Sequence, residues 1–357
     1  MEPSLISPTP LLPALLDFSA DAWDLGAAPA YRRRQLADWV FRRRAESFEA
    51  MSNLPAELRT DLAARYRLRP LELARLQGSK DTTRKFLWKL GAGDFVESVL
   101  IPANPALYGE RSDRFTLCVS SQVGCAYGCK FCASGLEGWK RNLTPGEIVA
   151  QILEAERIAG HRVDNLVFMG MGEPLANYKN LLIALDHINT PDGLNIGARH
   201  ITISTSGLAP VIRKLADHPR PFRLAISLHG ATDPIRDRIM PVNAKYPLAE
   251  LLDACAEFQA KKNKMITFEY ILIDGVNDQP DQAEALSQHA LRLRAKVNLI
   301  PYNTVEGLPW KRPANNTMRR FQSILRARGV TATIRLEKGH DIDAACGQLR
   351  LRELRSA

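Results

Sequence analysis

Three cysteines stand close together in the segment GCAYGCKFC, at Cys125, Cys129 and Cys132, with the spacing Cys-x3-Cys-x2-Cys. Three thiolates on one short loop can each hold an iron of a four-iron cluster and leave the fourth iron open. Such clusters usually take four cysteines, so a missing fourth ligand leaves an iron that can chelate a substrate. A structural zinc site is the alternative, but it normally has four closed ligands, and no His or Cys follows at zinc-finger spacing. The spacing therefore favours an iron–sulfur cluster with an open iron.

The bulk composition is that of a basic protein with redox or metal chemistry. The chain has 357 residues, 45% of them hydrophobic, which is enough for two or three domains. The net charge of +9 suits a polyanionic partner such as a nucleic acid. Six cysteines are too few for a secreted disulfide scaffold of this length, and their clustering is typical of a reducing cytosol. The N-terminus lacks a basic leader and no apolar run could span a bilayer, so we expect a cytoplasmic protein without a membrane partner.

The N-terminal part of the chain is expected to be basic and helical. Residues 1–30 are rich in Pro, Ala and Leu, and we expect them to pack irregularly or to stay mobile. Residues 31–80 begin with YRRRQLADWVFRRRAESFEAM, in which apolar residues at helical spacing lie among six arginines, and a second helix is expected after Leu54 and Pro55. Residues 81–110 hold the β-type runs RKFLWKL and FVESVLIP around GAGD, which predicts a β-hairpin linker.

Residues 111–345 alternate between strands and helices, and residues 346–357 form a short C-terminal segment. The candidate strands are FTLCVS, NLVFMG, HITIST, FRLAISL, MITFEYILI, KVNLI and TATIRL. Helical stretches such as TPGEIVAQILEAERIAG separate most of them, which predicts βαβ units and a parallel sheet that forms a complete or partial barrel. Ligands of such folds bind at the carboxyl ends of the strands. Polar residues after the strands should therefore converge, namely Cys125 to Cys132, Gly170 to Glu173, Ser204, Ser227 to His229, and Asn303.

The cysteine motif resembles that of the radical S-adenosylmethionine (SAM) superfamily, and GMGEP after the strand NLVFM is similar to the SAM-binding GGE motif of that superfamily. The segments FTLCVSSQVGCAYGCKFC, MGMGEPLANY, ITISTSGLAP, LAISLHGATDPIRDRIMPVN and GHDIDAACGQL resemble, in order, the RlmN/Cfr family of adenosine methyltransferases. The resemblance covers the chain from about Arg32 to Leu351. It implies an α/β fold, a radical SAM partial (β/α)6 barrel behind a helical RNA-binding accessory domain and the hairpin. The implied cofactors are a [4Fe–4S] cluster and SAM, two molecules per turnover.

The resemblance implies SAM contacts for residues that follow the strands. These residues are Gly172, Glu173, Ser204, Ser227, Leu228, His229 and Asn303. A carboxylate beside backbone carbonyls suits the amino group of SAM. Taken alone, Gly-x-Gly-Glu is more often a tight turn and His229 a satisfied structural histidine, and the family pattern gives His229 a contact mainly through its backbone.

The resemblance also implies catalytic roles for Cys346, Cys118 and Glu97. Carbon 2 or 8 of adenine is electron-poor and cannot attack the methyl group of SAM, whereas a radical can add to it. Cys346, in GHDIDAACGQL, would take a methyl group from one SAM, lose a hydrogen atom to a radical made from a second SAM, and add to the adenine. Cys118 would then attack the sulfur of Cys346 to release the product as a disulfide, and Glu97 would accept the proton of the adenine carbon. Without the resemblance, Cys118 would be interpreted as a buried strand cysteine, Cys346 as a residue that packs a helix, and Glu97 as a strand glutamate that points outward. Cys255 has no catalytic interpretation and is expected to be a core residue.

The function implied is methylation of carbon 2 of adenosine 2503 in 23S ribosomal RNA and of adenosine 37 in transfer RNAs, with the target base extruded from its stack. A Cfr-like methylation of carbon 8 is the alternative, because it would use the same catalytic residues. Lys130 and the segment WKRNLT resemble the Cfr-like members of the family. A non-catalytic iron–sulfur RNA-binding or redox-sensing protein would explain the cysteines and the charge, but not GMGEP or Cys346. Expected partners are both RNAs and a reducing protein such as a flavodoxin, for a monomeric enzyme. The arginines at 32–34 and 42–44 are candidates for phosphate contacts, the alternative being a solvated helix face.

Overall fold

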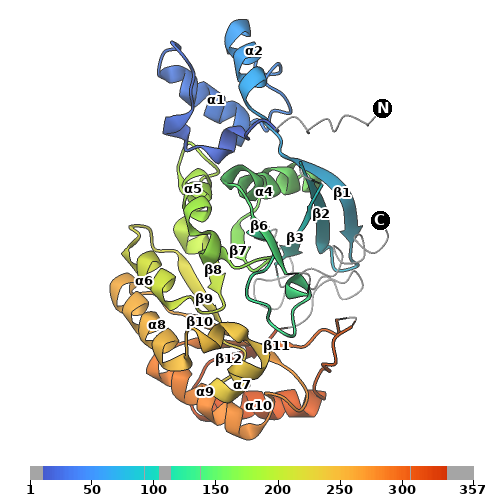
Figure 1. The fold of residues 1–357 in the computed structure, drawn as a ribbon, viewed down its shortest axis with the longest axis vertical. Helices are drawn as coiled ribbons and strands as arrows, with labels where there is room; N and C mark the ends of the chain where they lie inside the picture. Colours follow the sequence, from blue (N-terminus) through green and yellow to red (C-terminus); the bar gives the residue numbers. More distant parts are fainter. Residues whose placement is uncertain (1–10, 92, 104–113, 137, 306, 336–357) are drawn as a thin grey trace, which may run out of the picture.

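A computed structural model describes residues 11–91, 93–103, 114–136, 138–305 and 307–335. Two helices near the N-terminus form one end of the molecule, and the other elements are arranged around a large sheet (Figure 1). These two helices, α1 (Tyr31–Phe41) and α2 (Ala56–Arg65), lie where the apolar spacing predicted them.

Cys346 lies outside the described residues.

The segment that precedes α1 packs against the body of the protein. Its two short 3₁₀ turns are η1 (Leu15–Asp17) and η2 (Ala20–Ala22). Leu15, Leu16 and Trp23 are almost fully buried, so the residues from Ala14 to Leu25 match the first of the two expected alternatives, irregular packing. The physical reason is that three large apolar side chains find a place against the core, where each removes apolar surface from water.

The expected hairpin is present and is part of a larger antiparallel unit. Strands β2 (Arg84–Leu90) and β3 (Phe95–Pro102) pair antiparallel, and β1 (Leu71–Gly78) pairs antiparallel with β2. β1 falls in the stretch that we expected to be helical, so the expected helical character of that stretch is wrong beyond α2. β1 is an edge strand that is exposed over most of its length and therefore lacks the alternating buried pattern that marks a strand.

The main sheet has ten strands in the order β1-β2-β3-β4-β7-β8-β9-β10-β11-β12. The strands from β4 onward pair in parallel, and β3 joins them through an antiparallel pairing with β4, so the hairpin extends the sheet. All seven strands predicted for the core are present: β4 (Phe115–Cys118), β7 (Asn165–Phe168), β8 (Ile201–Thr205), β9 (Arg223–Ser227), β10 (Thr267–Leu272), β11 (Lys296–Pro301) and β12 (Ala332–Ile334). A separate pair, β5 (Gln122–Gly124) and β6 (Trp139–Asn142), follows β4.

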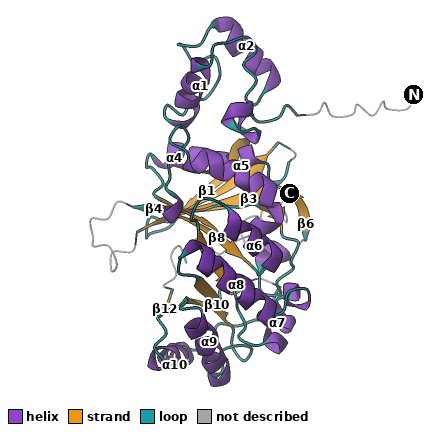
Figure 2. Cartoon of the chain, turned by 90° about the vertical axis from the view of Figure 1, so that its left-hand side faces the viewer, coloured by secondary structure: helices purple, strands orange, loops and turns teal. Residues whose placement is uncertain are grey.

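Helices connect the parallel strands and cover one side of the sheet, and α6, α8 and α9 follow one another there (Figure 2). They are α4 (Pro145–Ala159), α5 (Tyr178–Asn189), α6 (Ala209–Asp217), α7 (Asp233–Ile239), α8 (Leu248–Lys262), α9 (Pro280–Arg292) and α10 (Asn315–Ala327). Short 3₁₀ turns are η3 (Ala133–Gly135), η4 (Pro174–Asn177), η5 (Ala198–His200) and η6 (Pro241–Ala244). Within the described parts of the chain, no helix combines the length and apolar character needed to cross a bilayer.

The strand register separates the side chains into a face toward α4 and an inward face. Toward α4, the indole of Trp88 donates to the Ser98 hydroxyl at 3.0 Å, and this hydroxyl donates to Gln151 of α4 at 2.8 Å. Side chains alternate along a strand, so Glu97 and Val99 point to the opposite face. The pairings Lys85–Val99, Val99–Cys118 and Cys118–Val167 extend that inward face across β2, β3, β4 and β7.

Candidate active site

The three clustered cysteines lie on a tight loop between β5 and η3. The loop is held by backbone hydrogen bonds from Cys125 to the Gly138 carbonyl at 3.2 Å and from Cys132 to the Cys129 carbonyl at 3.1 Å. Gly128 between them has a φ of +55°, which a residue without Cβ adopts at little cost. The loop therefore brings three thiols together on a fixed backbone, as the spacing predicted.

The donor set suits an iron–sulfur cluster. Burial raises the pKa of Cys125 to about 12 and raises that of Cys129 well above its usual value. Cys132 adds to the raised pKa of both thiols, and Cys125 adds to that of Cys129. Buried thiols so close together keep their protons unless a metal displaces them. In the described residues, no three His, Cys, Asp or Glu side chains are arranged around a single metal ion. A four-iron cluster does not need three ligands around one metal ion. It needs one thiolate for each of three irons, and this loop has three thiols.

Glu173 follows β7 and its carboxylate is fixed in the interior. One oxygen accepts hydrogen bonds from the backbone N–H and the hydroxyl of Ser206, at 2.7 and 2.9 Å, and the other accepts from the N–H of Leu175 at 3.0 Å. Burial raises the pKa of Glu173, and these hydrogen bonds oppose the rise. The negative charge of Glu173 also contributes to the raised pKa of Cys125 and Cys129, so the carboxylate lies near the cysteine loop.

The glycines before Glu173 are required by close packing. A Cβ at Gly172, whose φ is +96°, would lie 2.5 Å from the Cβ of Gln122, and a Cβ at Gly170 would lie 2.7 Å from the Ser120 hydroxyl. The side chain of Gln122 in turn accepts a hydrogen bond from the N–H of Glu173 at 2.8 Å. The turn after β7 therefore packs directly on the segment that leads into the cysteine loop.

The carboxyl ends of β8 and β9 meet at two serines. The hydroxyls of Ser204 and Ser227 lie 3.4 Å apart, at the same edge of the sheet as Glu173. Asn303 comes two residues after β11, at the corresponding end of that strand, and is half-buried. The strand ends thus bring the predicted polar residues to one edge, as the parallel topology requires.

Leu228 and His229 continue from β9 and connect to β10. Their N–H groups donate to the carbonyl of Glu269 at 3.0 and 3.3 Å, and Nδ1 of His229 accepts from the N–H of Ile271 at 3.0 Å. Burial lowers the pKa of His229 to about 3, so its ring is neutral, and it forms a T-shaped contact with the ring of Phe131, with centroids 4.9 Å apart. The side chain therefore has the satisfied structural environment that the sequence suggested for a lone histidine.

Arg236 is a site residue that the sequence did not single out. It lies on α7 with no exposed surface and donates to the carbonyls of Ser206, at 3.0 Å, and of Leu228, and to the side chain of Asn243 at 2.9 Å. Burial lowers its pKa to about 10. Its segment, DPIRDRI, has the charge pattern of a solvated helix, and only the quoted resemblance of LAISLHGATDPIRDRIMPVN indicated that it belongs to the site.

Cys118 and Glu97 lie on the inward face of the sheet. Burial raises the pKa of Cys118 to about 11, and the nearby charge of Arg335 opposes this rise. Glu97 is almost fully buried, and its carboxylate forms an ion pair with the ammonium of Lys85 at 2.9 Å. The charge of Glu97 adds to the raised pKa of both Cys118 and Cys132, so these three residues share one region. Glu97 is thus an inward residue, and the outward alternative is wrong.

The other two cysteines fall into different classes. Cys255, on α8, has no exposed surface and is part of the hydrophobic core, as expected. Its pKa rises to about 12 because of burial, so it is an unreactive thiol at neutral pH. Cys346 lies outside the described residues, and its expected role in methyl transfer stays a prediction.

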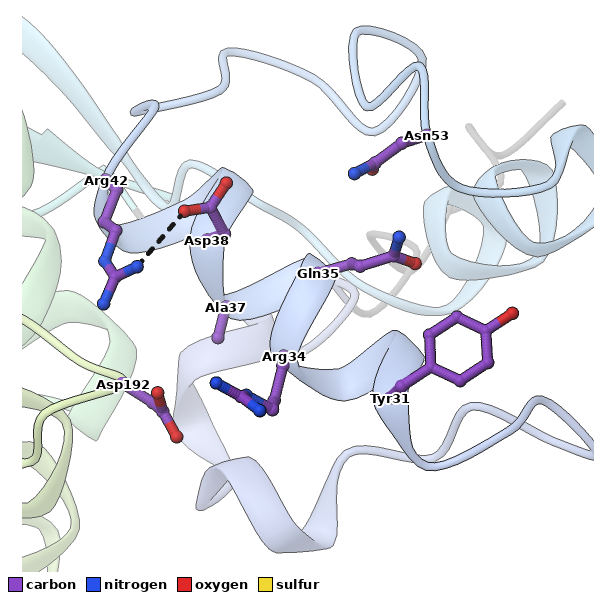
Figure 3. A pocket seen from close by; sticks show the side chains of 8 residues that line it. All are labelled: Tyr31, Arg34, Gln35, Ala37, Asp38, Arg42, Asn53 and Asp192. Atoms are coloured by element: carbon purple, nitrogen blue, oxygen red, sulfur yellow. Dashed lines mark ion pairs between the residues drawn. The ribbon is translucent and has the colours of Figure 1, made fainter.

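Most of the arginines that were candidates for phosphate contacts have partners within the protein. Arg33 donates to the carbonyl of Trp23 at 3.3 Å, Arg43 pairs with Asp38 at 2.7 Å, and Arg44 pairs with Glu156 of α4. Arg34 and Arg42 line a hollow of about 360 Å³ beside α1, in which Arg42 pairs with Asp38 (Figure 3). Because most of these guanidinium groups already have partners in the protein, the number of arginines alone overstates the positive charge that is available to RNA.

Fold and site together define a radical SAM methyltransferase. The sequence-family model of the radical SAM superfamily matches residues 119–285. The family model of the ribosomal RNA large subunit methyltransferase N-terminal domain matches residues 17–68. The crystal structure of a radical SAM methyltransferase from Sphaerobacter thermophilus superposes with a TM-score of 0.88 at 44% identity, covering 94% of this chain and 98% of that one. The chain therefore takes a [4Fe–4S] cluster and SAM as its cofactors.

The family can be stated more narrowly. A probable dual-specificity RNA methyltransferase RlmN of Akkermansia muciniphila is 60% identical over 323 residues, which are 90% of each protein. The dual-specificity RNA methyltransferase RlmN of Anaeromyxobacter dehalogenans is 50% identical and covers 91% of this chain and 87% of its own length. The chain belongs to the RlmN family of RNA methyltransferases. The N-terminal family match begins at residue 17, earlier than the start near Arg32 that we expected, in keeping with the packed segment before α1.

Proposed function

We propose that this enzyme methylates carbon 2 of adenosine 2503 in 23S ribosomal RNA and of adenosine 37 in transfer RNAs. The observation that supports the proposal is that Glu97 and Cys118 share the inward face of the sheet, and that the charge of Glu97 reaches both Cys118 and Cys132 of the cysteine loop. A base, a nucleophilic thiol and a radical-generating centre in one region are what a radical methylation of an unactivated ring carbon needs. The high identity to RlmN relatives supports carbon 2 over carbon 8.

Cys125, Cys129 and Cys132 would hold the cluster. When bound and reduced, the cluster would supply the electron for the reductive cleavage of SAM. Glu173, kept in place by Ser206, is suited to accept hydrogen bonds from the SAM ammonium group. The remaining SAM contacts would come from the other strand ends, namely Gly172, Ser204, Ser227, Leu228, His229 and Asn303.

The covalent steps would use this chain's own thiols and carboxylate. Cys346 would attack the methyl group of a first SAM and become S-methylcysteine, and the radical from a second SAM would remove one hydrogen atom from it. The resulting methylene radical would add to the adenine and tie the RNA to the protein. Glu97 would accept the proton from the ring carbon, and the thiolate of Cys118 would attack the Cys346 sulfur to form a disulfide. The electron pair of the broken sulfur–carbon bond would pass to the methylene carbon, which would take up a proton and become the methyl group of the product. A reducing protein such as a flavodoxin would supply the electron for the cluster.

Nucleoside analysis of 23S ribosomal RNA tests the regiochemistry. RNA from a knockout strain complemented with this chain is digested, and the methylated adenosines are separated by chromatography and mass spectrometry. We expect 2-methyladenosine, and the same analysis of transfer RNA should find it at position 37. 8-Methyladenosine in its place would reject carbon 2 in favour of the Cfr-like alternative.

A Cys346→Ala variant tests the covalent route. We expect it to form neither S-methylcysteine nor methylated RNA. Cys255→Ala is a suitable control, since Cys255 is a buried core thiol on α8 and its replacement should leave the product unchanged. Normal product from Cys346→Ala would reject the methyl-carrier role of this cysteine.

A further inference from the structure

We propose that Lys85 is the positioning residue of Glu97: its ammonium group fixes the orientation of the Glu97 carboxylate on the inward face. This inference rests on the proposed function, in which Glu97 takes the proton from the adenine carbon. Neither the cysteine motifs nor the SAM-binding residues involve Lys85, and its sequence context, RKFLWKL, suggests only an ordinary strand lysine.

The geometry of the pair is closely defined. Nζ of Lys85 lies 2.9 Å from Oε2 of Glu97, and the exposed fractions of the two side chains are 0% and 3%. The register places Lys85 opposite Val99, and Val99 lies two residues after Glu97 on the same face of β3. Val99 is in turn opposite Cys118, so the ion pair lies beside the thiol that would release the product.

Stability alone is a poor reason for a charged pair at this position. Removing two charges from water is expensive, and a buried ion pair is often no more stabilising than an apolar pair of similar size. β2 already carries the buried apolar residues Phe86, Leu87 and Trp88, so the strand accommodates such side chains. Lys89 shows the ordinary alternative on the same strand, since it is half-exposed and pairs with Glu72 at the surface at 3.7 Å.

Proton transfer from the adenine ring carbon to Glu97 provides a chemical role for the Lys85–Glu97 ion pair. After the methylene radical has added, the hydrogen–carbon bond at the ring carbon breaks and the proton passes to an oxygen of Glu97. The electron pair of that bond stays in the ring, and the return of aromaticity requires the loss of one ring electron to a one-electron acceptor, which the oxidised iron–sulfur cluster would supply. A carboxylate takes this proton efficiently only when one of its oxygens is held toward the ring carbon. The ion pair with Lys85 limits the orientations that the Glu97 carboxylate can adopt.

The test uses full-length enzyme with a reconstituted cluster, and an RNA fragment with hydrogen or deuterium at carbon 2 of the target adenine. The variants are Lys85→Met and Lys85→Gln, which remove the charge, Lys85→Arg, which keeps it, and the matched control Lys89→Met. The measured quantities are S-methylation of Cys346, 5′-deoxyadenosine from the first turnover, and the decay of the covalent protein–RNA adduct.

For Lys85→Met and Lys85→Gln we expect normal S-methylation and normal first-turnover 5′-deoxyadenosine, but adduct decay slowed at least about tenfold, within the range of a lost general base. Deuterium should slow this decay further, because proton removal becomes rate-limiting. Lys85→Arg should restore most of the rate, Lys89→Met should match the unaltered enzyme, and Lys85→Met in a Glu97→Gln background should cause no additional slowing.

Three results would overturn the inference: unaltered adduct decay in both uncharged variants, slow decay without a deuterium effect, or loss of the S-methylation step together with adduct decay. If Lys85→Met and Lys85→Gln do not load the cluster, a rate for Lys85→Arg far below that of the unaltered enzyme at normal cluster content would also reject it. An unaltered enzyme that makes no methylated adenine would instead reject the proposed function, so the two failures are distinguishable.

Discussion

Ser206 holds the carboxylate of Glu173 twice, through its backbone N–H at 2.7 Å and its hydroxyl at 2.9 Å. Both donors reach the same oxygen, and both residues are more than nine-tenths buried. The bonds join the turn after β7 to the end of β8, so the carboxylate has one orientation at the edge of the sheet where the strand ends meet. This orientation matters because a single carboxylate is suited to meet the ammonium of SAM.

Replacing Ser206 with Ala removes the hydroxyl bond and keeps the backbone bond. A hydrogen bond to a charged group contributes about 1.5–3 kcal/mol, so we expect SAM to bind at least about tenfold more weakly. Equilibrium SAM binding to the cluster-loaded enzyme measures the effect. Ser323→Ala on the outer face of α10 removes a hydroxyl that donates only to the carbonyl of Arg319, and it should bind SAM normally. Unchanged affinity in Ser206→Ala would show that Glu173 does not depend on this hydroxyl.

Much of the fold could be predicted because local signals agree. The segment TPGE begins α4 with a reciprocal cap between Thr144 and Glu147, and short apolar runs of the core alternate with such helices. The edge strand β1 could not be predicted in the same way, because most of its side chains are exposed and no alternating buried pattern arises. The convergence of the strand ends followed from topology alone, since parallel strands place their carboxyl ends at one edge.

The charged residues of the site show where prediction from sequence fails. Lys85 and Lys89 are four positions apart on one strand, so their side chains leave the same face, yet one has no exposed surface and the other is half-exposed. This difference in exposure depends on which parts of the fold pack over each side chain, and no local sequence pattern predicts it. The sequence does not indicate the burial of Arg236 for the same reason, because this burial depends on the segments after β8 and β9, which are distant in sequence.

A cluster-loaded enzyme should cleave SAM. After anaerobic reconstitution with iron and sulfide and chemical reduction, we expect the enzyme to make 5′-deoxyadenosine, because a cluster with three thiolate ligands leaves one iron open. Cys132→Ala should lose the cluster absorbance and this product together, while Cys255→Ala should keep both. A stable cluster that yields no 5′-deoxyadenosine, even with RNA present, would favour a redox sensor. Preferential binding of zinc by protein kept free of oxygen would favour a structural metal site.

Release of the methylated RNA should depend on pH through Cys118. Burial raises the pKa of this thiol to about 11, above its ordinary value, so only a small fraction is thiolate at neutral pH. The thiolate is the nucleophile, and its fraction grows by about tenfold per pH unit until the pKa is reached. Decay of a preformed protein–RNA adduct should therefore accelerate steadily from neutral pH to pH 9, when followed on denaturing gels. A flat profile would contradict a rate set by Cys118 ionisation, and Cys118→Ala should leave the adduct intact at every pH.

Arg236 should matter for stability before it matters for chemistry. Its guanidinium satisfies the carbonyls of Ser206 and Leu228 and the side chain of Asn243, all in the interior. Arg236→Met would leave buried acceptors without a donor at a cost of about 1–3 kcal/mol each, so we expect the free energy of unfolding to fall by about 3 kcal/mol or more. Urea unfolding followed by circular dichroism measures this loss. Arg238→Met, two residues further along α7 on the exposed side, loses only a contact with the ring of Trp310 and should shift the midpoint little. Equal midpoints for the two variants would mean that the carbonyls at the ends of β8 and β9 do not need Arg236, and that other contacts hold this edge of the sheet.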